Sequence, residues 1–287
     1  MTINSTQISR EYITNKIKSF YESNYASRDI GIIKTVLDNV IDLFNGKKEG
    51  FQRCDAQYHN LTHTLQTIPP FVDIIDGWNK SSNTPKVSEE FFGMGIIAVL
   101  LHDTGYIKKE GDTLGTGAKY TFEHIQRSID FASRYLAEIG FDKQKITQIK
   151  NVIGCTGVSI NLERFSFASE EERITGYALG TADLLGQMAA DDYPEKLPVL
   201  FKEYDESYNY IGIEEMREQG IKKFENADEL LASTKDFYEA TVMERFKKMG
   251  SIYKYVESHH PGMKNLYIEA IEENIRRIES SPAKKVV

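Results

Sequence analysis

Two short stretches of the sequence place histidine beside other side chains that could bind metal or transfer protons. The stretch QYHNLTHTLQT carries His59 and His63, and VLLHDTGY carries His102 followed by Asp103. The chain has only six histidines, so half of them lie here. Residues four apart are just over one helical turn apart, so we expect His59 and His63 to face the same point from one helix. This spacing suits a metal site, or a metal ligand beside a proton donor, but it also occurs on ordinary polar helix faces.

Two carboxylates interrupt apolar sequence. Asp103 comes at the end of the stretch IIAVLLHD, and Asp183 lies within YALGTADLLGQM, where apolar residues surround it on nearly every side. An ionised carboxylate in a buried helix is costly unless it is paired, hydrogen-bonded or bound to a cation. A divalent metal ion would meet this need for both residues. The alternative is that Asp103 ends a helix beside Gly105 and that Asp183 pairs with a lysine or arginine.

His63, His102, Asp103 and Asp183 together form a mixed nitrogen and oxygen ligand set. Such a set suits Zn, Mn, Fe, Co or Ni better than Ca, and it leaves positions open for water. Water bound to such an ion is acidified and becomes a nucleophile near neutral pH. The four residues therefore predict a hydrolytic metal site built at or near the ends of core helices.

The order of these motifs resembles the HD-domain metal-dependent phosphohydrolase superfamily. YHNLTH, then LLHDTGY, then the distant Asp in GTADLLGQM follow that superfamily's pattern, and the YHNxxH form is similar to its cyclic nucleotide phosphodiesterase branch. The resemblance covers roughly residues 55–190. It implies an all-α bundle in which His63, His102, Asp103 and Asp183 bind the metal.

The resemblance also implies roles for residues outside the ligand set. His59 would be catalytic together with Asp103, donating a proton to the leaving oxygen, and Asn60 would orient His59. His124 falls where many relatives have a histidine that binds a second metal or the phosphate, and its neighbour Glu123 is a weaker candidate.

Three basic residues could meet a substrate phosphate as positive charges. Lys108 and Lys109 follow the His-Asp turn in a Gly-rich loop, and Arg127 lies one turn beyond His124. The alternative is that they are solvated surface side chains.

Two departures from the pattern favour one metal ion over two. Many relatives have His or Lys after HDTG, where this chain has Tyr106, and a later helix often carries a histidine near the position of Cys155 in VIGCTG. A second site would therefore be weak and built on His124. The ion itself stays open among Mn, Fe, Zn, Co, Ni and Mg.

The function that the resemblance implies is hydrolysis of a phosphoester, as a phosphomonoesterase or phosphodiesterase acting on a nucleotide or another small phosphate ester. Three alternatives remain. The first is an HD-type di-iron oxygenase, which needs a complete two-metal site. The second is a catalytically silent sensor that binds a nucleotide or metal and signals through the C-terminal helices. The third is a structural or interaction protein.

Helical periodicity dominates the chain and predicts the all-α fold independently of the resemblance. No segment shows the sustained two-residue alternation of strands joined by hairpin turns. We expect one core over residues 1–210 and a helical extension, 211–287, packed on it. The segments with helical spacing are 9–23, 28–46, 88–106, 122–140, 142–155, 171–189, 193–208, 226–249 and 263–280.

Composition and charge argue against two classes of partner. The net charge of −8 and the isoelectric point of about 5.4 disfavour nucleic acid and anionic membranes, which bind basic faces. Cys54 and Cys155 form no CxxC pattern, so neither a disulfide framework nor a thiolate zinc site is expected. The N-terminus lacks the features of a signal peptide, and the longest apolar run is too short to span a bilayer. We expect a cytoplasmic protein that binds a small phosphorylated substrate, with a homodimer left open.

Overall fold

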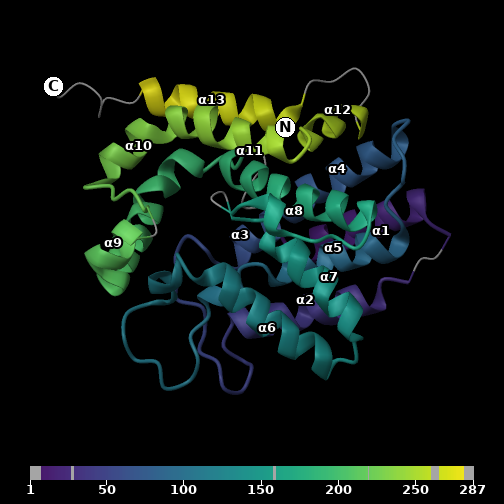
Figure 1. The fold of residues 1–287 in the computed structure, drawn as a ribbon, viewed down its shortest axis with the longest axis horizontal. Coiled ribbons are helices and arrows are strands. Elements are labelled where there is room, and N and C mark those ends of the chain that lie inside the picture. Colours follow the sequence, from purple (N-terminus) through teal and green to yellow (C-terminus); the bar gives the residue numbers. More distant parts are fainter. Residues whose placement is uncertain (1–7, 27–28, 158–159, 219, 260–264, 281–287) are drawn as a thin grey trace.

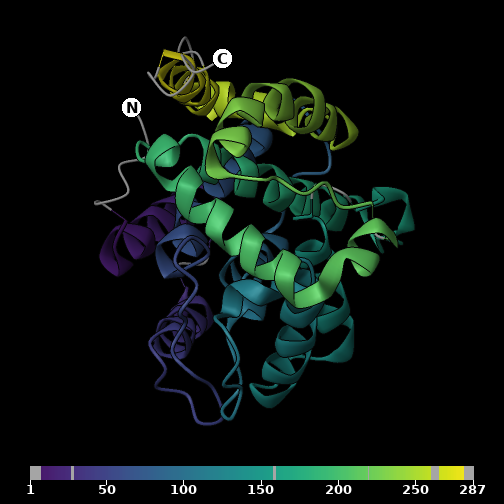
Figure 2. The ribbon, with the colours of Figure 1, turned by 90° about the vertical axis from the view of Figure 1, so that its left-hand side faces the viewer.

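The computed structural model describes residues 8–26, 29–157, 160–218, 220–259 and 265–280. Within these ranges the chain is all-α, as the sequence predicts: they contain no strand, and one isolated bridge joins Phe51 to Lys109. Figures 1 and 2 show the helices α10 to α13 lying along one side of the molecule. None of the helices described is both long enough and apolar enough to cross a bilayer.

The helices before residue 190 form the main body of the molecule and carry all four predicted metal ligands. Short 3-10 turns at Thr104–Tyr106, Gly117–Tyr120 and Leu162–Arg164 lie in the connections between them. The helices are α1 (Arg10–Asn24), α2 (Gly31–Phe44), α3 (Leu61–Gln66), α4 (Ile68–Lys80), α5 (Glu89–Leu101), α6 (His124–Glu138), α7 (Lys143–Gly154) and α8 (Glu170–Met188).

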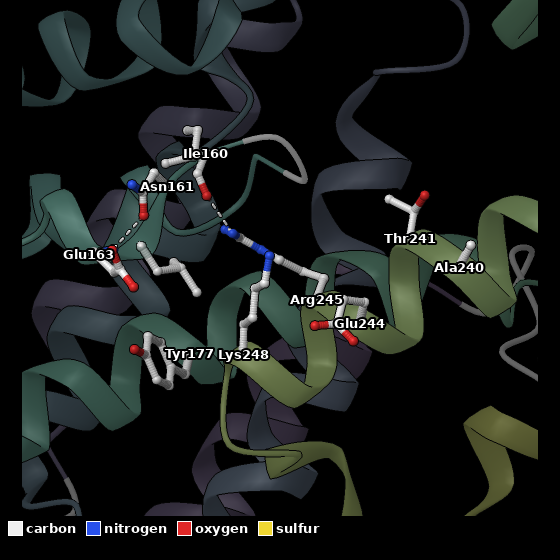
Figure 3. A pocket seen from close by; sticks show the side chains of 10 residues that line it. Ile160, Asn161, Glu163, Tyr177, Ala240, Thr241, Glu244, Arg245 and Lys248 are labelled. Carbon is white, nitrogen blue, oxygen red and sulfur yellow. Dashed lines mark hydrogen bonds between the residues drawn. The ribbon is translucent and has the colours of Figure 1, made fainter.

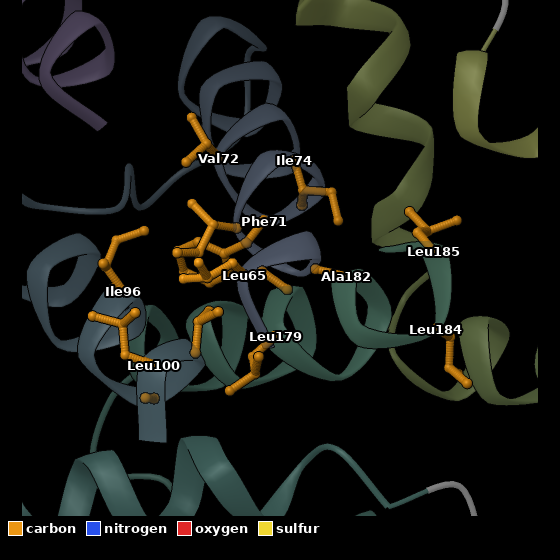
Figure 4. Close-up of a cluster of buried hydrophobic side chains, with 14 of the residues drawn as sticks. Leu65, Phe71, Val72, Ile74, Ile96, Leu100, Leu179, Ala182, Leu184 and Leu185 are labelled. Carbon is orange, nitrogen blue, oxygen red and sulfur yellow. The ribbon is translucent and has the colours of Figure 1, made fainter. Parts of the chain in front are cut away.

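Helix α5 lies at the centre of this body, which explains why its sequence is apolar on every side. Every residue from Met94 to Leu101 is buried, and α2, α4, α7 and α8 pack around the helix. Figure 4 shows side chains of α3, α4, α5 and α8 gathered in one apolar cluster, among them Leu65, Phe71 and Leu179. Because α5 ends inside this core, the polar residues that follow it are buried as well.

Capping residues begin the helices where the sequence pattern expects them to begin. Ser88 accepts a hydrogen bond from the Phe91 amide at the start of α5, and Ser169 accepts one from the Glu172 amide at the start of α8. Each of these caps satisfies an amide that has no partner inside the helix. The local sequence therefore sets where these helices begin.

Two predicted helices are interrupted, and the sequence pattern predicts neither α4 nor α12 (Tyr255–His259). The segment 88–106 stops being α-helical at Leu101 and tightens into the 3-10 turn at Thr104–Tyr106. The segment 226–249 is divided by a π-helical turn. Helix α4 begins with IPPF, and prolines are tolerated there because the first helical turn needs no amide hydrogen.

The C-terminal helices share the core of the main body. The predicted boundary at residue 210 falls inside α9, which bends at Gly212, where the backbone φ is 82°. Helix α10 packs on α9, α12 packs on α4, and α13 packs on α8. Phe246 and Ile271 are fully buried in the same apolar cluster as α5. The elements are α9 (Tyr193–Glu218), α10 (Ala227–Asp236), the π-helical turn Phe237–Val242, α11 (Met243–Lys248), α12 (Tyr255–His259) and α13 (Leu266–Ser280).

Candidate metal centre

The structure brings His63, His102, Asp103 and Asp183 together at one point; we call these four residues the ligand cluster. His102 Nε2 lies 3.3 Å from Asp103 Oδ2 and 3.5 Å from Asp183 Oδ1. His63 Nε2 lies 3.6 Å and 3.8 Å from the same two oxygens. Nitrogen and oxygen ligands about 2.0–2.1 Å from a tetrahedral ion are about 3.3–3.5 Å from one another. The spacing of these atoms is therefore close to that of ligands around a shared ion.

Two atoms of the ligand cluster are buried without a hydrogen-bond partner, namely His102 Nε2 and Asp103 Oδ2. His63, His102 and Asp103 are at most 5% exposed. A buried polar atom that makes no bond is costly, and a cation between these atoms would satisfy both. The three residues form a buried group that could hold a metal ion. Asp183 is more open to solvent, so it marks the side from which a ligand would approach.

Burial and neighbouring charges shift the pKa values of His63, His102 and Asp103. Burial would lower the pKa of His102, but the carboxylates of Asp103 and Asp183 outweigh it and raise that pKa to about 9. Burial would raise the pKa of Asp103, but His102 and His63 lower it to about 2. Burial dominates at His63 and lowers its pKa to about 4. Without an ion, the cluster therefore keeps a proton on His102 to balance its carboxylates.

Local backbone contacts aim the imidazoles of His102 and His124. His102 Nδ1 donates to the carbonyl of Val99 at 2.7 Å, and His124 Nδ1 donates to the carbonyl of Thr121 at 2.6 Å. Each bond keeps a proton on Nδ1 and leaves Nε2 facing inward, where it can bind a metal ion once it carries no proton. Metal-binding histidines are commonly held in this way.

His59 and His63 do not lie on one helix, so the prediction from their spacing is wrong in that respect. Helix α3 begins at Leu61 with Asn60 as its N-cap, and His59 lies in the turn before it. The two rings still approach, with centroids 5.1 Å apart. The turn lets His59 reach the edge of the ligand cluster from a different direction.

Asn60 positions His63 and not, as we expected, His59. Its Oδ1 accepts hydrogen bonds from the amides of Thr62 at 3.0 Å and His63 at 3.2 Å, and its amide group donates to the carbonyl of Gln57. Asn60 therefore caps the short helix that carries a ligand.

Glu203 of α9 holds His59. His59 Nδ1 donates to Glu203 Oε2 at 2.6 Å, and the amide of Tyr58 donates to Glu203 Oε1 at 2.7 Å. Burial would lower the pKa of His59, but the negative charge of Glu203 outweighs it and raises that pKa. The pKa of Glu203 is lowered, because the charge of His59 and the hydrogen bonds that it accepts overcome its burial. The pair therefore favours the protonated form of His59 beside the ligand cluster.

Tyr106 stacks on both His59 and His124, whose own ring centroids lie 6.2 Å apart. Its ring lies 4.3 Å from that of His59 and 4.7 Å from that of His124, centroid to centroid. His124 Nε2 lies 4.0 Å from Asp103 Oδ1, the oxygen that faces away from His63 and His102. The structure therefore places His124 beside the ligand cluster. The absence of a side chain at Gly105 allows the backbone of His124 to pack against the turn that carries Asp103, because a Cβ at Gly105 would lie 2.0 Å from the carbonyl oxygen of His124.

Lys108, a predicted phosphate contact, is engaged by an aspartate and a backbone carbonyl of its own chain. Lys108 is buried, its Nζ lies 2.9 Å from Asp55 Oδ2, and it donates to the carbonyl of Gly115 at 2.6 Å. Asp55 Oδ1 also accepts from the amide of Gly117. In the described residues Lys108 therefore holds the loop that follows the His-Asp turn.

Arg127, Lys109 and Glu123 likewise have no contact with the ligand cluster within the ranges that the structure describes. Arg127 Nε donates to the carbonyl of Gly105 at 2.7 Å, and its guanidinium lies 3.4 Å from the centre of the Tyr120 ring. Lys109 and Glu123 are exposed. Arg127 braces the turn that carries Asp103, so its influence on the cluster is indirect.

Glu203 is the residue of this site that sequence reasoning missed. It lies in the stretch LFKEYDESY, whose spacing predicts a helix but marks no functional residue. Its position three residues after Leu200 and four before Ser207 puts it on the buried face of α9. A glutamate on a buried helix face is the signal that could have revealed it.

These observations define an all-α protein with a buried His-His-Asp group that could hold a metal ion. The chain belongs to the Npun_R2479-like family, whose sequence profile matches residues 3–280. The match runs across the ligand cluster and the C-terminal helices alike. No curated protein and no solved structure matches the chain.

Proposed function

We propose that this protein is a metal-dependent hydrolase that cleaves a phosphoester, a nucleotide or another small phosphate ester. The observation that carries the proposal is the meeting of the ligand cluster with His59, whose protonated form is favoured by Glu203, at its edge. A divalent ion held by His63, His102, Asp103 and Asp183 would supply Lewis acidity and lower the pKa of water. The resemblance to HD-domain phosphohydrolases supports the same reading.

His59 would act as the general acid in this reaction. Its Nδ1 is held by Glu203, which leaves Nε2 to give a proton to the oxygen that departs from phosphorus. Glu203 contributes by orienting the ring and by favouring its charged form. His124 is the remaining predicted phosphate contact that lies at the cluster, through Asp103.

Three variants and a chromogenic phosphodiester test the proposal. We expect the protein with added Mn²⁺ to hydrolyse bis(4-nitrophenyl) phosphate. His102→Ala and Asp183→Ala should lose bound metal and activity together, since each removes a ligand. His59→Ala should keep its metal and lose turnover of an alkyl phosphoester, whose departing oxygen needs a proton. If Asp183→Ala held metal as tightly as the wild type, the ligand assignment would be wrong.

A di-iron oxygenase is the second candidate, because Asp103 faces two sides. One of its oxygens lies near His63 and His102, and the other lies 4.0 Å from His124 Nε2. A carboxylate placed in this way can bridge two ions. Binding of two iron ions per chain and oxygen uptake with a reduced substrate would favour this candidate over hydrolysis.

A further inference from the structure

A cavity lies away from the ligand cluster, between α8, α11 and the segment 160–163 (Figure 3). Its volume is about 670 Å³, within the usual range for small-molecule sites. None of the residues that line it belongs to the ligand cluster. The π-helical turn before α11 forms one wall through Ala240 and Thr241, and such turns are frequent at functional sites.

Arg245 lines this cavity as a buried cation. Its side chain is almost fully buried; Nη1 donates to the carbonyl of Ile160 at 2.6 Å and Nη2 to that of Cys155 at 3.1 Å, while Nε has no acceptor. No carboxylate of the described residues lies within ion-pair distance of it. Burial lowers the pKa of Arg245. A buried guanidinium without a counter-charge is costly, and an anionic ligand would offset that cost.

Lys248 adds a second positive charge to the same wall. It lies three residues after Arg245 on α11, so the two side chains share a helix face. Figure 3 shows the side chain of Lys248 extending toward the guanidinium of Arg245. Two neighbouring cations make this wall suited to one compact anionic group such as a carboxylate or a phosphate.

The other walls are apolar or mildly acidic. Leu162 and Tyr177 supply an aliphatic and an aromatic surface to the lining. Glu163 and Glu244 are exposed members of the lining, and Glu244 lies 3.5 Å from the Nζ of Lys247. Their negative charges would repel an extended polyanion. A small molecule with a single anionic end could bind beside the two cations without approaching the two glutamates.

We propose that this cavity binds a small organic anion, with its carboxylate or phosphate against Arg245 and Lys248 and its apolar body against Tyr177 and Leu162. The proposal does not depend on the hydrolase activity proposed above. Tyr177 and Asp183 are six residues apart on α8, which corresponds to about 9 Å along the helix axis. The cavity is thus a separate site on a helix that also carries a residue of the ligand cluster.

The test uses 4-fluorobenzoate and 4-fluorophenyl phosphate as probes, observed by fluorine NMR with the whole chain in EDTA. The chelator keeps metal from the ligand cluster, so neither hydrolysis nor metal binding of the phosphate interferes. We expect at least one probe to bind, and its dissociation constant to rise about tenfold or more in Lys248→Glu. Lys247→Glu is the matched control: it makes the same charge change on the adjacent exposed residue, which does not line the cavity.

Arg245→Gln should abolish probe binding, with circular dichroism to confirm the fold. If that variant does not fold, the comparison of Lys248→Glu with Lys247→Glu decides alone. Asp183→Ala should bind the probe as the wild type does, because the ligand cluster is a different site. The proposal is overturned if the wild type binds neither probe, if the two lysine variants weaken binding equally, or if Asp183→Ala abolishes it. If 4-fluorobenzoate binds more tightly, the cavity prefers a carboxylate; if 4-fluorophenyl phosphate binds more tightly, it prefers a phosphate.

Discussion

Replacing Glu203 with glutamine tests whether His59 is a general acid held and charged by its neighbour. Glu203 is 4% exposed and accepts hydrogen bonds from His59 Nδ1 at 2.6 Å and from the Tyr58 amide at 2.7 Å. Glutamine keeps the size and one acceptor but removes the charge. General acid catalysis contributes a rate enhancement of roughly 10²–10⁴-fold. Loss of a residue that only orients a catalytic group lowers activity by about 10- to 100-fold, and we expect a loss of this smaller size for Glu203→Gln.

The variant should also change the pH dependence of the rate in a defined direction. His59 can donate only while it is protonated, and Glu203 raises its pKa. Without that charge, burial is left to lower the pKa of His59, so the fall of kcat at high pH should begin at a lower pH than in the wild type.

The assay compares two substrates that differ in the basicity of the departing oxygen. 4-Nitrophenolate leaves without a proton, whereas an alkoxide needs one. Glu203→Gln should therefore slow hydrolysis of an alkyl phosphoester far more than that of a nitrophenyl phosphoester, with metal content unchanged. Glu206→Gln is the control: Glu206 lies one turn further along α9, and its Oε2 accepts from the hydroxyl of Thr116 at 2.6 Å. Equal losses on both substrates, or a loss of metal, would refute the reasoning.

Three further predictions concern the ligand cluster and its supports. Metal binding to the wild type should release about one proton at pH 7.5 and progressively less as the pH rises through about 9, because His102 with its pKa of about 9 is charged before the ion binds at the lower pH; calorimetry in buffers of different ionisation enthalpy measures this. Asn60→Ala should cost about 1 kcal/mol in thermal or urea unfolding and weaken metal binding through α3, while Asn60→Asp keeps both. Gly105→Ala should destabilise by about 1–3 kcal/mol and displace His124, seen as a changed imidazole signal by NMR, since the new Cβ would lie 2.0 Å from a carbonyl oxygen.

The sequence was sufficient to predict the fold class and to nominate residues that meet in space. Helices α5 and α8 are apolar on most sides, so a carboxylate at the end of one and within the other had to find a partner in the core. That physical need is local to each helix and can be read from the sequence. Asp103 and Asp183 were nominated on this ground, and the structure places both beside the same two histidines.

What the sequence could not supply depends on contacts between distant segments. Glu203 lies 144 residues from His59, and the spacing of α9 alone does not say which face of the core it meets. Lys108 looked like a phosphate contact because its distant partner, the Asp55 carboxylate, could not be foreseen. The turn before α3 was missed because a four-residue spacing is equally compatible with a helix and with a cap followed by a helix.

Anomalous scattering from a crystal soaked in MnCl₂ tests the central claim most directly. The account predicts a strong Mn²⁺ peak enclosed by His63 Nε2, His102 Nε2 and the carboxylates of Asp103 and Asp183, and no peak there in a crystal of Asp183→Ala. A second, weaker peak between Asp103 and His124 would add an ion without changing the claim. Absence of manganese from the ligand cluster at millimolar concentration, with His102 Nε2 left facing empty space, would contradict it.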